Sequence, residues 1–391
     1  MQRIAAIDIL RALTMVLMIF VNDLGSLHDV PRWLVHVPPG ADGIGLADTV
    51  FPAFLFIVGL SLPLAIDQRR RKGDTEWQLV RHVLMRSIAL LVMGVFTVNG
   101  ETLNAAAMGM SQAVYYPLCG VCFILIWNVY PETTNKNLVL LSKTIGIAGL
   151  VAVAISYRGD QDGHVVRFAR QWWGILGLIG WAYLASGLIT IFTKNRFLVI
   201  GAAWALFCLL SMAGKAGLVP PLVRDLVPDA ISGGTLTGLT MGGVVTSLIF
   251  QYFRRKHDDK GLAFVCLLFS GLLIGASMIT RPYWRLAKIE ATPAWLFLCS
   301  ALTIVAFLLV HWLASIRRKA SWFEVIEPAG TDTLLCYFMP YFVSLPLWLL
   351  RLHWPDAMLD GGVGLLKSLV YALVCVVLAG RLTRLGIALK V

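Results

Sequence analysis

Three polar side chains near the amino terminus have the composition of an acid–base site. Asn22 ends one apolar stretch, Asp48 begins the next, and His36 lies in the loop between them beside Pro38 and Pro39. An imidazole can take up a proton near neutral pH, a carboxylate can orient it, and an amide can stabilise a carbonyl oxygen. The sequence therefore predicts a general-base site where two adjacent helices end.

Each of the three residues also has a purely structural interpretation. The Asn22 amide can satisfy backbone groups at a helix end. Asp48 can act as the N-cap of the second helix, a role worth about 0.5–2 kcal/mol. His36 can be an ordinary loop histidine. The sequence leaves both interpretations open.

A pair of charges interrupts the first apolar stretch. Asp8 and Arg11 are three residues apart, so they share one face of a helix and are expected to form an ion pair. Inserting one such group into a membrane costs about 2.5–3.5 kcal/mol, which makes the pair a candidate functional site. The pair either fixes helix packing or places the Arg11 guanidinium where it can bind a phosphorylated ligand.

The elements that position these residues are expected to be membrane-spanning helices. Of the 391 residues, 58% are hydrophobic and 14% are charged, whereas soluble domains are about 25% charged. Apolar stretches close to the roughly 20 residues of a transmembrane helix recur along the chain. We expect an all-α polytopic membrane helix bundle of about 12 transmembrane helices, forming a single domain over residues 1–391. The expected spans are residues 4–21, 49–66, 87–98, 113–130, 139–157, 172–192, 197–212, 237–253, 262–279, 294–315, 333–350 and 363–380.

The net charge of +11 is explained by topology. Lysines and arginines are about twice as frequent on one side of the expected spans as on the other, and the richer side should face the cytoplasm. Both termini are then cytoplasmic, in a multi-pass protein of the cell (inner) membrane. The excess charge requires no nucleic-acid partner. All seven cysteines fall in apolar stretches, so neither disulfides nor a metal site is expected.

Two segments resemble a known enzyme family. "RIAAIDILRALTMVLMIFVNDLG" and "GLADTVFPAFLFIVGLSLPLAI", within about the first 66 residues, are similar to the catalytic core of the heparan-α-glucosaminide N-acetyltransferase family of transmembrane acyltransferases. A later segment, "GTDTLLCYF" at 330–338, looks like a late helix of that family, with Asp332 where an asparagine is usual.

The resemblance implies that an acetyl group moves from cytosolic acetyl-CoA to an amino sugar on the opposite side of the membrane. The family's functional residues correspond to Asn22, His36 and Asp48, with His36 as the catalytic imidazole. The loop between His36 and Asp48 is about two residues longer than in the family, so His28 is an alternative to His36. We assign acetyl-CoA binding to Arg11 with its partner Asp8, and to Arg69, Arg70 and Arg71.

Several alternatives remain at this point. His36 can act as a general base or as a nucleophile that forms an acetyl-histidine intermediate. The enzyme can be an O-acyltransferase for a cell-envelope saccharide, or the chain can be a solute transporter or flippase without covalent chemistry. The expected partners are a saccharide acceptor and the lipid bilayer, with a homodimer as the assembly to test.

Overall fold

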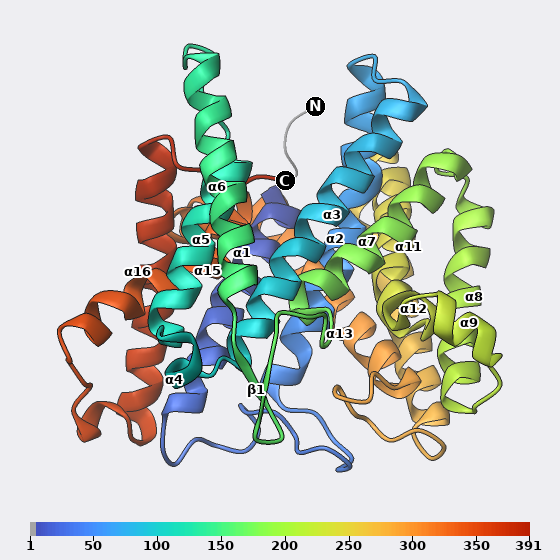
Figure 1. The fold of residues 1–391 in the computed structure, drawn as a ribbon. Helices are drawn as coiled ribbons and strands as arrows, with labels where there is room; N and C mark the ends of the chain where they lie inside the picture. Colours follow the sequence, from blue (N-terminus) through green and yellow to red (C-terminus); the bar gives the residue numbers. More distant parts are fainter. Residues whose placement is uncertain (1–4) are drawn as a thin grey trace.

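The computed structural model describes residues 5–391 as a bundle of long helices (Figure 1). Arg3 and Ile4, which contributed to the expected topology and first span, lie outside the described residues. Within those residues, ten helices are long and apolar enough to cross a membrane, and two further apolar helices are shorter. The predicted all-α polytopic membrane fold is therefore confirmed.

The helices that match the expected spans follow one another along the whole chain. The ten long ones are α1 Ala5–Asp23, α2 Leu46–Arg71, α3 Glu76–Glu101, α6 Lys136–Ser156, α7 Gly174–Thr193, α8 Phe197–Lys215, α11 Thr235–Lys256, α12 Asp259–Thr280, α13 Pro293–His311 and α16 Gly361–Arg384. The two shorter apolar helices are α5 Gln112–Trp127 and α15 Thr333–Leu349.

Short elements connect these helices. They include the helices α4 Ala105–Met108, α9 Pro221–Leu226, α10 Asp229–Ser232 and α14 Glu327–Thr331, and the hairpin of β1 Gly159–Gln161 with β2 His164–Val166. A π-helical turn, Trp312–Ile316, continues α13. The 3₁₀ turns are Leu24–Ser26, Ala320–Ile326 and Asp356–Met358.

Helix α3 corrects the third expected span. The sequence predicts a span over 87–98 only, but the helix is 26 residues long, Glu76–Glu101. Thr75 and Gln78 form a reciprocal cap, in which each side chain accepts a hydrogen bond from the other's backbone N–H. Arg86 and the charges before it lower the local hydropathy, yet arginine favours a helix. Hydropathy alone therefore placed the start of this helix too late.

The centre of the bundle is formed by α1, α2 and α11. In its most apolar 18-residue window, α11 has 83% of its residues buried, whereas α6 has 17%. Figure 1 shows α5, α6 and α16 on one flank and α8 and α12 on the other. The start of α1 and the C terminus lie at the same end of the bundle. The flanking helices therefore provide the lipid-facing surface expected of a membrane protein.

The long loop between α1 and α2 covers the opposite end of the bundle (Figure 1). The His28 amide donates to the Leu359 carbonyl at 2.8 Å, and the Gly43 amide donates to the Leu286 carbonyl at 3.0 Å. These bonds tie the loop to the segments that precede α16 and α13. The loop that carries His36 is therefore held in place rather than extended into solvent.

The α2 and α11 backbones touch at two glycines. A Cβ added to Gly59 would lie 1.8 Å from the Thr240 carbonyl oxygen, and one added to Gly243 would lie 2.0 Å from the Phe56 carbonyl oxygen. Small residues at a helix interface let two backbones approach closely, which is a common way to pack helices in membranes. The position of α2, and of the site at its start, depends on this contact.

We predict that Gly243→Ala destabilises the protein, because overpacking typically costs about 1–3 kcal/mol. Gly271→Ala in α12 is the matched control, since a Cβ added there meets no atom within 4 Å among the described residues, apart from its own helix backbone. Thermal unfolding of the purified variants in detergent measures the difference. Equal melting temperatures for the two variants would contradict the predicted backbone contact.

Candidate active site

Asp48 lies in the first turn of α2, where its carboxylate is enclosed by hydrogen-bond donors. Gly45 precedes the helix, so the expectation that Asp48 is the N-cap is wrong. Asp48 is instead the third helical residue, and its Oδ2 accepts from the amides of Gly45 and Val37, both at 3.0 Å. A carboxylate at this position satisfies backbone donors and interacts favourably with the helix dipole. Only 2% of its side chain is exposed.

His36 is the direct partner of this carboxylate. Its Nδ1 lies 2.7 Å from Asp48 Oδ1, so in the neutral ring Nδ1 carries the hydrogen and donates a hydrogen bond to the carboxylate. The Nε2 lone pair then remains able to accept a proton. Because 47% of the His36 side chain is exposed, a substrate can reach it. The pair has the geometry of a base oriented by a carboxylate.

Helix α13 and the loop before it complete this cluster. Trp295 Nε1 donates a hydrogen bond to the Asp48 carbonyl oxygen at 3.0 Å, which fixes the start of α2. Lys288 Nζ lies 3.3 Å from both ring nitrogens of His36. Burial lowers the pKa of Lys288, and the nearby Asp48 charge partly opposes that shift. Lys288 was not among the predicted site residues, because only the fold brings it next to His36.

Asn22 lies at the end of α1 and lines a different space. This cavity of about 160 Å³ also borders Tyr337, Tyr341 and Tyr371. Among residues 5–391, Asn22 has no hydrogen bond to His36 or to Asp48. The structure thus brings two of the three predicted residues together, and the membership of Asn22 in the same site stays a prediction.

The alternative histidine is elsewhere in the loop. The backbone of His28 forms an isolated β-bridge with that of Asp360, next to the start of α16. The His28 residue itself is exposed. In the described part of the chain, no carboxylate forms a hydrogen bond with its ring. His36 is the one of these two histidines that has a carboxylate partner.

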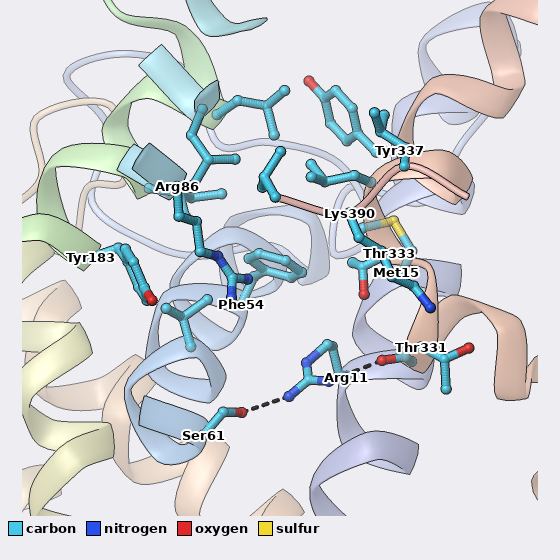
Figure 2. Close-up of a pocket in the computed structure, with 18 of the residues that line it drawn as sticks. Arg11, Met15, Phe54, Ser61, Arg86, Tyr183, Thr331, Thr333, Tyr337 and Lys390 are labelled. Carbon is cyan, nitrogen blue, oxygen red and sulfur yellow. Dashed lines mark hydrogen bonds between the residues drawn. The ribbon is translucent and has the colours of Figure 1, made fainter. Parts of the chain in front are cut away.

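A larger cavity of about 330 Å³ lies deeper in the bundle, bordered by α1, α2, α3, α7 and α15. Figure 2 shows Arg11, Arg86 and Lys390 among its lining residues. Most of the remaining wall is apolar, with Met15, Met18, Phe54, Val58, Leu90 and Leu334 among the residues that form it. Met18 and Tyr337 line both this cavity and the smaller one beside Asn22, so the two spaces are neighbours.

Arg11 joins three helices within the wall of this cavity. The predicted ion pair is confirmed, with Arg11 Nη1 3.1 Å from Asp8 Oδ1. The same guanidinium donates to the Gly330 carbonyl oxygen at 2.9 Å and to Ser61 Oγ at 2.6 Å (Figure 2). Arg11 therefore has the structural role of connecting α1, α2 and α14, and it also places a positive charge beside the cavity.

Arg86 and Lys390 add two cations to the same wall. The Arg86 guanidinium lies 4.9 Å from the centre of the Tyr183 ring. Its buried Nε has no hydrogen-bond partner among the described residues. Lys390 Nζ is 2.9 Å from Asp332 Oδ1, so the aspartate that differs from the family pattern has a counter-ion here. The cavity combines a cationic region with an apolar passage.

The arginines at the end of α2 do not line this cavity. Arg69 binds Asp74 at 2.6 Å, and Arg70 contacts Glu76 and the Ile191 carbonyl oxygen. Arg71 is also not among the residues that line this cavity. The contacts of Arg69 with Asp74 and of Arg70 with Glu76 stabilise the turn into α3. The cavity gives no support to the assignment of these three arginines to acetyl-CoA binding, which stays a prediction. Arg86 and Lys390 were visible in the sequence only as basic residues near expected spans.

Comparisons with known proteins agree with the sequence resemblance. A family model described as "Domain of unknown function (DUF5009)" matches residues 3–219. The heparan-alpha-glucosaminide N-acetyltransferase of Mus musculus is 33% identical over 98 residues, and that of Homo sapiens is 31% identical over 97 residues. Each match covers 25% of this chain and 14% of the relative's own length.

Removing the Asp48 carboxylate should release the loop around His36. In Asp48→Ala, the amides of Val37 and Gly45 lose their acceptor, and a hydrogen bond to a charged group is worth about 1.5–3 kcal/mol. Their hydrogen exchange should accelerate about 10- to 100-fold. Asp29→Asn changes an exposed charge in the same loop and serves as control. Unchanged protection at both amides in Asp48→Ala would contradict the described geometry.

The half-buried position of Lys288 predicts an unusual amine reactivity. Because burial lowers its pKa, the neutral amine should react with an acylating reagent with a midpoint below the ordinary lysine value of about 10.4. Asp48→Asn removes a charge that favours the ammonium, so the midpoint should fall further. Site-resolved mass spectrometry across a pH series measures both values. A midpoint that rises in Asp48→Asn would be inconsistent with this arrangement.

Proposed function

The chain belongs to the DUF5009 family, and we propose that it is a membrane-embedded acetyltransferase that takes its acetyl group from acetyl-CoA. The observation that carries the proposal is the 2.7 Å hydrogen bond between His36 and the buried Asp48 carboxylate. It provides an oriented base inside the segment that resembles an acetyltransferase core. The names of the mouse and human relatives support the same reaction class.

The cavity between the helices fits the proposed acetyl donor. Arg86 and Lys390 would bind the phosphates of CoA, together with the charge that Arg11 places in the wall. The buried Arg86 Nε–H donates no hydrogen bond to any of the described residues, and a phosphate oxygen can accept one from it. The apolar part of the wall would hold the pantetheine arm. Since the cavity adjoins the space beside Asn22, the thioester end would lie towards the loop end of the bundle.

The reaction would then use the side chains at that end. His36 Nε2 removes a proton from the acceptor amine as the amine nitrogen bonds to the thioester carbonyl carbon. The C–S bond breaks, CoA leaves as the thiolate, and the imidazolium returns a proton to it. Asp48 stabilises the imidazolium, and the Asn22 amide would donate a hydrogen bond to the carbonyl oxygen. In the alternative order, His36 itself is acetylated first.

The acceptor in this proposal is an amino sugar on the side of the membrane opposite the termini, with the termini in the cytosol. The alternative acceptor is a cell-envelope saccharide that is acetylated on a hydroxyl group. Glucosamine and glucose, offered in parallel, distinguish transfer to an amine from transfer to a hydroxyl. A product that carries an amide-linked acetyl group supports N-acetylation, and an ester-linked product would overturn it.

We predict that His36→Ala abolishes most acetyl transfer. The purified protein, supplied with labelled acetyl-CoA and amino sugars, should release CoA about 10²- to 10⁴-fold more slowly in this variant, which is the usual contribution of a general base. His28→Ala should retain activity, because no carboxylate of residues 5–391 forms a hydrogen bond with the His28 ring. CoA release at the wild-type rate in His36→Ala would overturn the assignment.

We also predict that Arg86→Gln weakens donor binding. Losing one charge-assisted hydrogen bond should raise the KM for acetyl-CoA about tenfold or more and leave kcat nearly unchanged. Arg81→Gln, on the same helix but beside a different pocket, is the matched control. Equal KM values for the two variants would place the CoA phosphates outside this cavity.

A further inference from the structure

A third cavity, of about 720 Å³, lies apart from the proposed active site. It is bordered by the end of α2, the turn between α7 and α8, the last turns of α11 and the first half of α12. This is the end of the bundle at which the C terminus lies (Figure 1). No residue that lines the proposed donor cavity lines this one. The third cavity is therefore separate from the proposed donor cavity.

The polar groups of this cavity have both signs of charge. Lys194 and Arg255 are the cations that line it, and Asp67 and Asn195 provide acceptor oxygens. Asn195 Nδ2 donates to Asp67 Oδ1 at 2.8 Å. Asn195 Oδ1 is buried and has no hydrogen-bond partner among residues 5–391. A buried acceptor without a donor is unusual in a folded protein and indicates a missing partner.

The turn that carries two of these groups is conformationally costly. Lys194 and Asn195 both have left-handed backbone conformations, with φ of 50° and 58°. Asparagine tolerates this region, but lysine does so at a cost, and such residues concentrate where structure serves binding. The turn places both side chains on the cavity wall, one as a cation and the other as an acceptor.

The rest of the cavity wall is largely apolar and lies beside peripheral helices. Phe197, Leu248 and Phe253 are among its apolar lining residues. Helices α8 and α12, which border it, are peripheral. Only 22% of the residues in the most apolar part of α8 are buried, and 28% of those in the corresponding part of α12. Phe197 is 50% exposed, and neighbouring Phe264 is 69% exposed. Cationic side chains beside an apolar, lipid-facing wall are typical of a site for a phospholipid headgroup.

We propose that this cavity binds a zwitterionic phospholipid whose headgroup joins a phosphate to a primary ammonium. Lys194 and Arg255 hold the phosphate, while the Asp67 carboxylate and Asn195 Oδ1 accept hydrogen bonds from the ammonium. The acyl chains lie against Phe197 and the exposed faces of α8 and α12. The Asp67 carboxylate disfavours a lipid whose headgroup carries only negative charge.

Native mass spectrometry of the delipidated full chain tests the proposal. Phosphatidylethanolamine, phosphatidylglycerol and soluble glycerophosphoethanolamine are added separately. We expect phosphatidylethanolamine to be retained preferentially, and its affinity to fall about tenfold in Arg255→Gln, which removes a charge-assisted contact. Arg254→Gln, the adjacent arginine that does not line the cavity, should leave the affinity unchanged.

Two further variants test the acceptor side. Asp67→Asn should abolish the preference for phosphatidylethanolamine over phosphatidylglycerol, and Asn195→Ala should reduce it without altering the Asp67 charge. Three results would overturn the proposal: equal retention of the two lipids by the wild type, equal losses in Arg254→Gln and Arg255→Gln, or soluble glycerophosphoethanolamine that binds as tightly as the lipid. The last result would indicate a free headgroup compound as ligand.

Discussion

The Asp48 carboxylate is the constraint on which the rest of the site depends. A buried charge at the end of a membrane helix must have hydrogen-bond partners, because its desolvation is otherwise too costly. Asp48 obtains them from the amides of Gly45 and Val37 and from the His36 ring. Those bonds fold the loop back over the helix end. The imidazole is thus oriented by the same interactions that allow the carboxylate to be buried.

Helix α1 connects this arrangement to the interior of the bundle. It carries Arg11 in the wall of the proposed donor cavity and Asn22 at the cavity of about 160 Å³. Asn22 follows 11 residues later, which is about 16 Å along the axis at 1.5 Å per residue. The hydrogen bonds of Arg11 to Ser61 and Gly330 fix α1 against α2 and α14. One rigid helix therefore sets the spacing between the cationic cavity and the end of the bundle where the proposed base lies.

The sequence was sufficient for the fold class and for one half of the site. Apolar stretches predicted the spans, and the Asp8–Arg11 pair followed from helical spacing alone. The contact between His36 and Asp48, 12 residues apart in sequence, is local enough that composition and family resemblance indicated both residues. Lys288, Arg86 and Lys390 could not be chosen from the sequence, because packing of distant segments brings Lys288 next to His36 and the other two to the wall of the proposed donor cavity. Arg69, Arg70 and Arg71 have suitable charges, but local contacts occupy Arg69 and Arg70.

The most direct test is an experimental structure with a non-hydrolysable acetyl-CoA analogue. We expect density for the phosphates beside Arg86 and Lys390, and for the pantetheine along the apolar wall, with the acyl end directed towards Asn22 and Nε2 of His36. An analogue bound outside this cavity, or bound within it with its acyl end directed away from these two residues, would contradict the claim that the cavity and the His36–Asp48 pair belong to one active site.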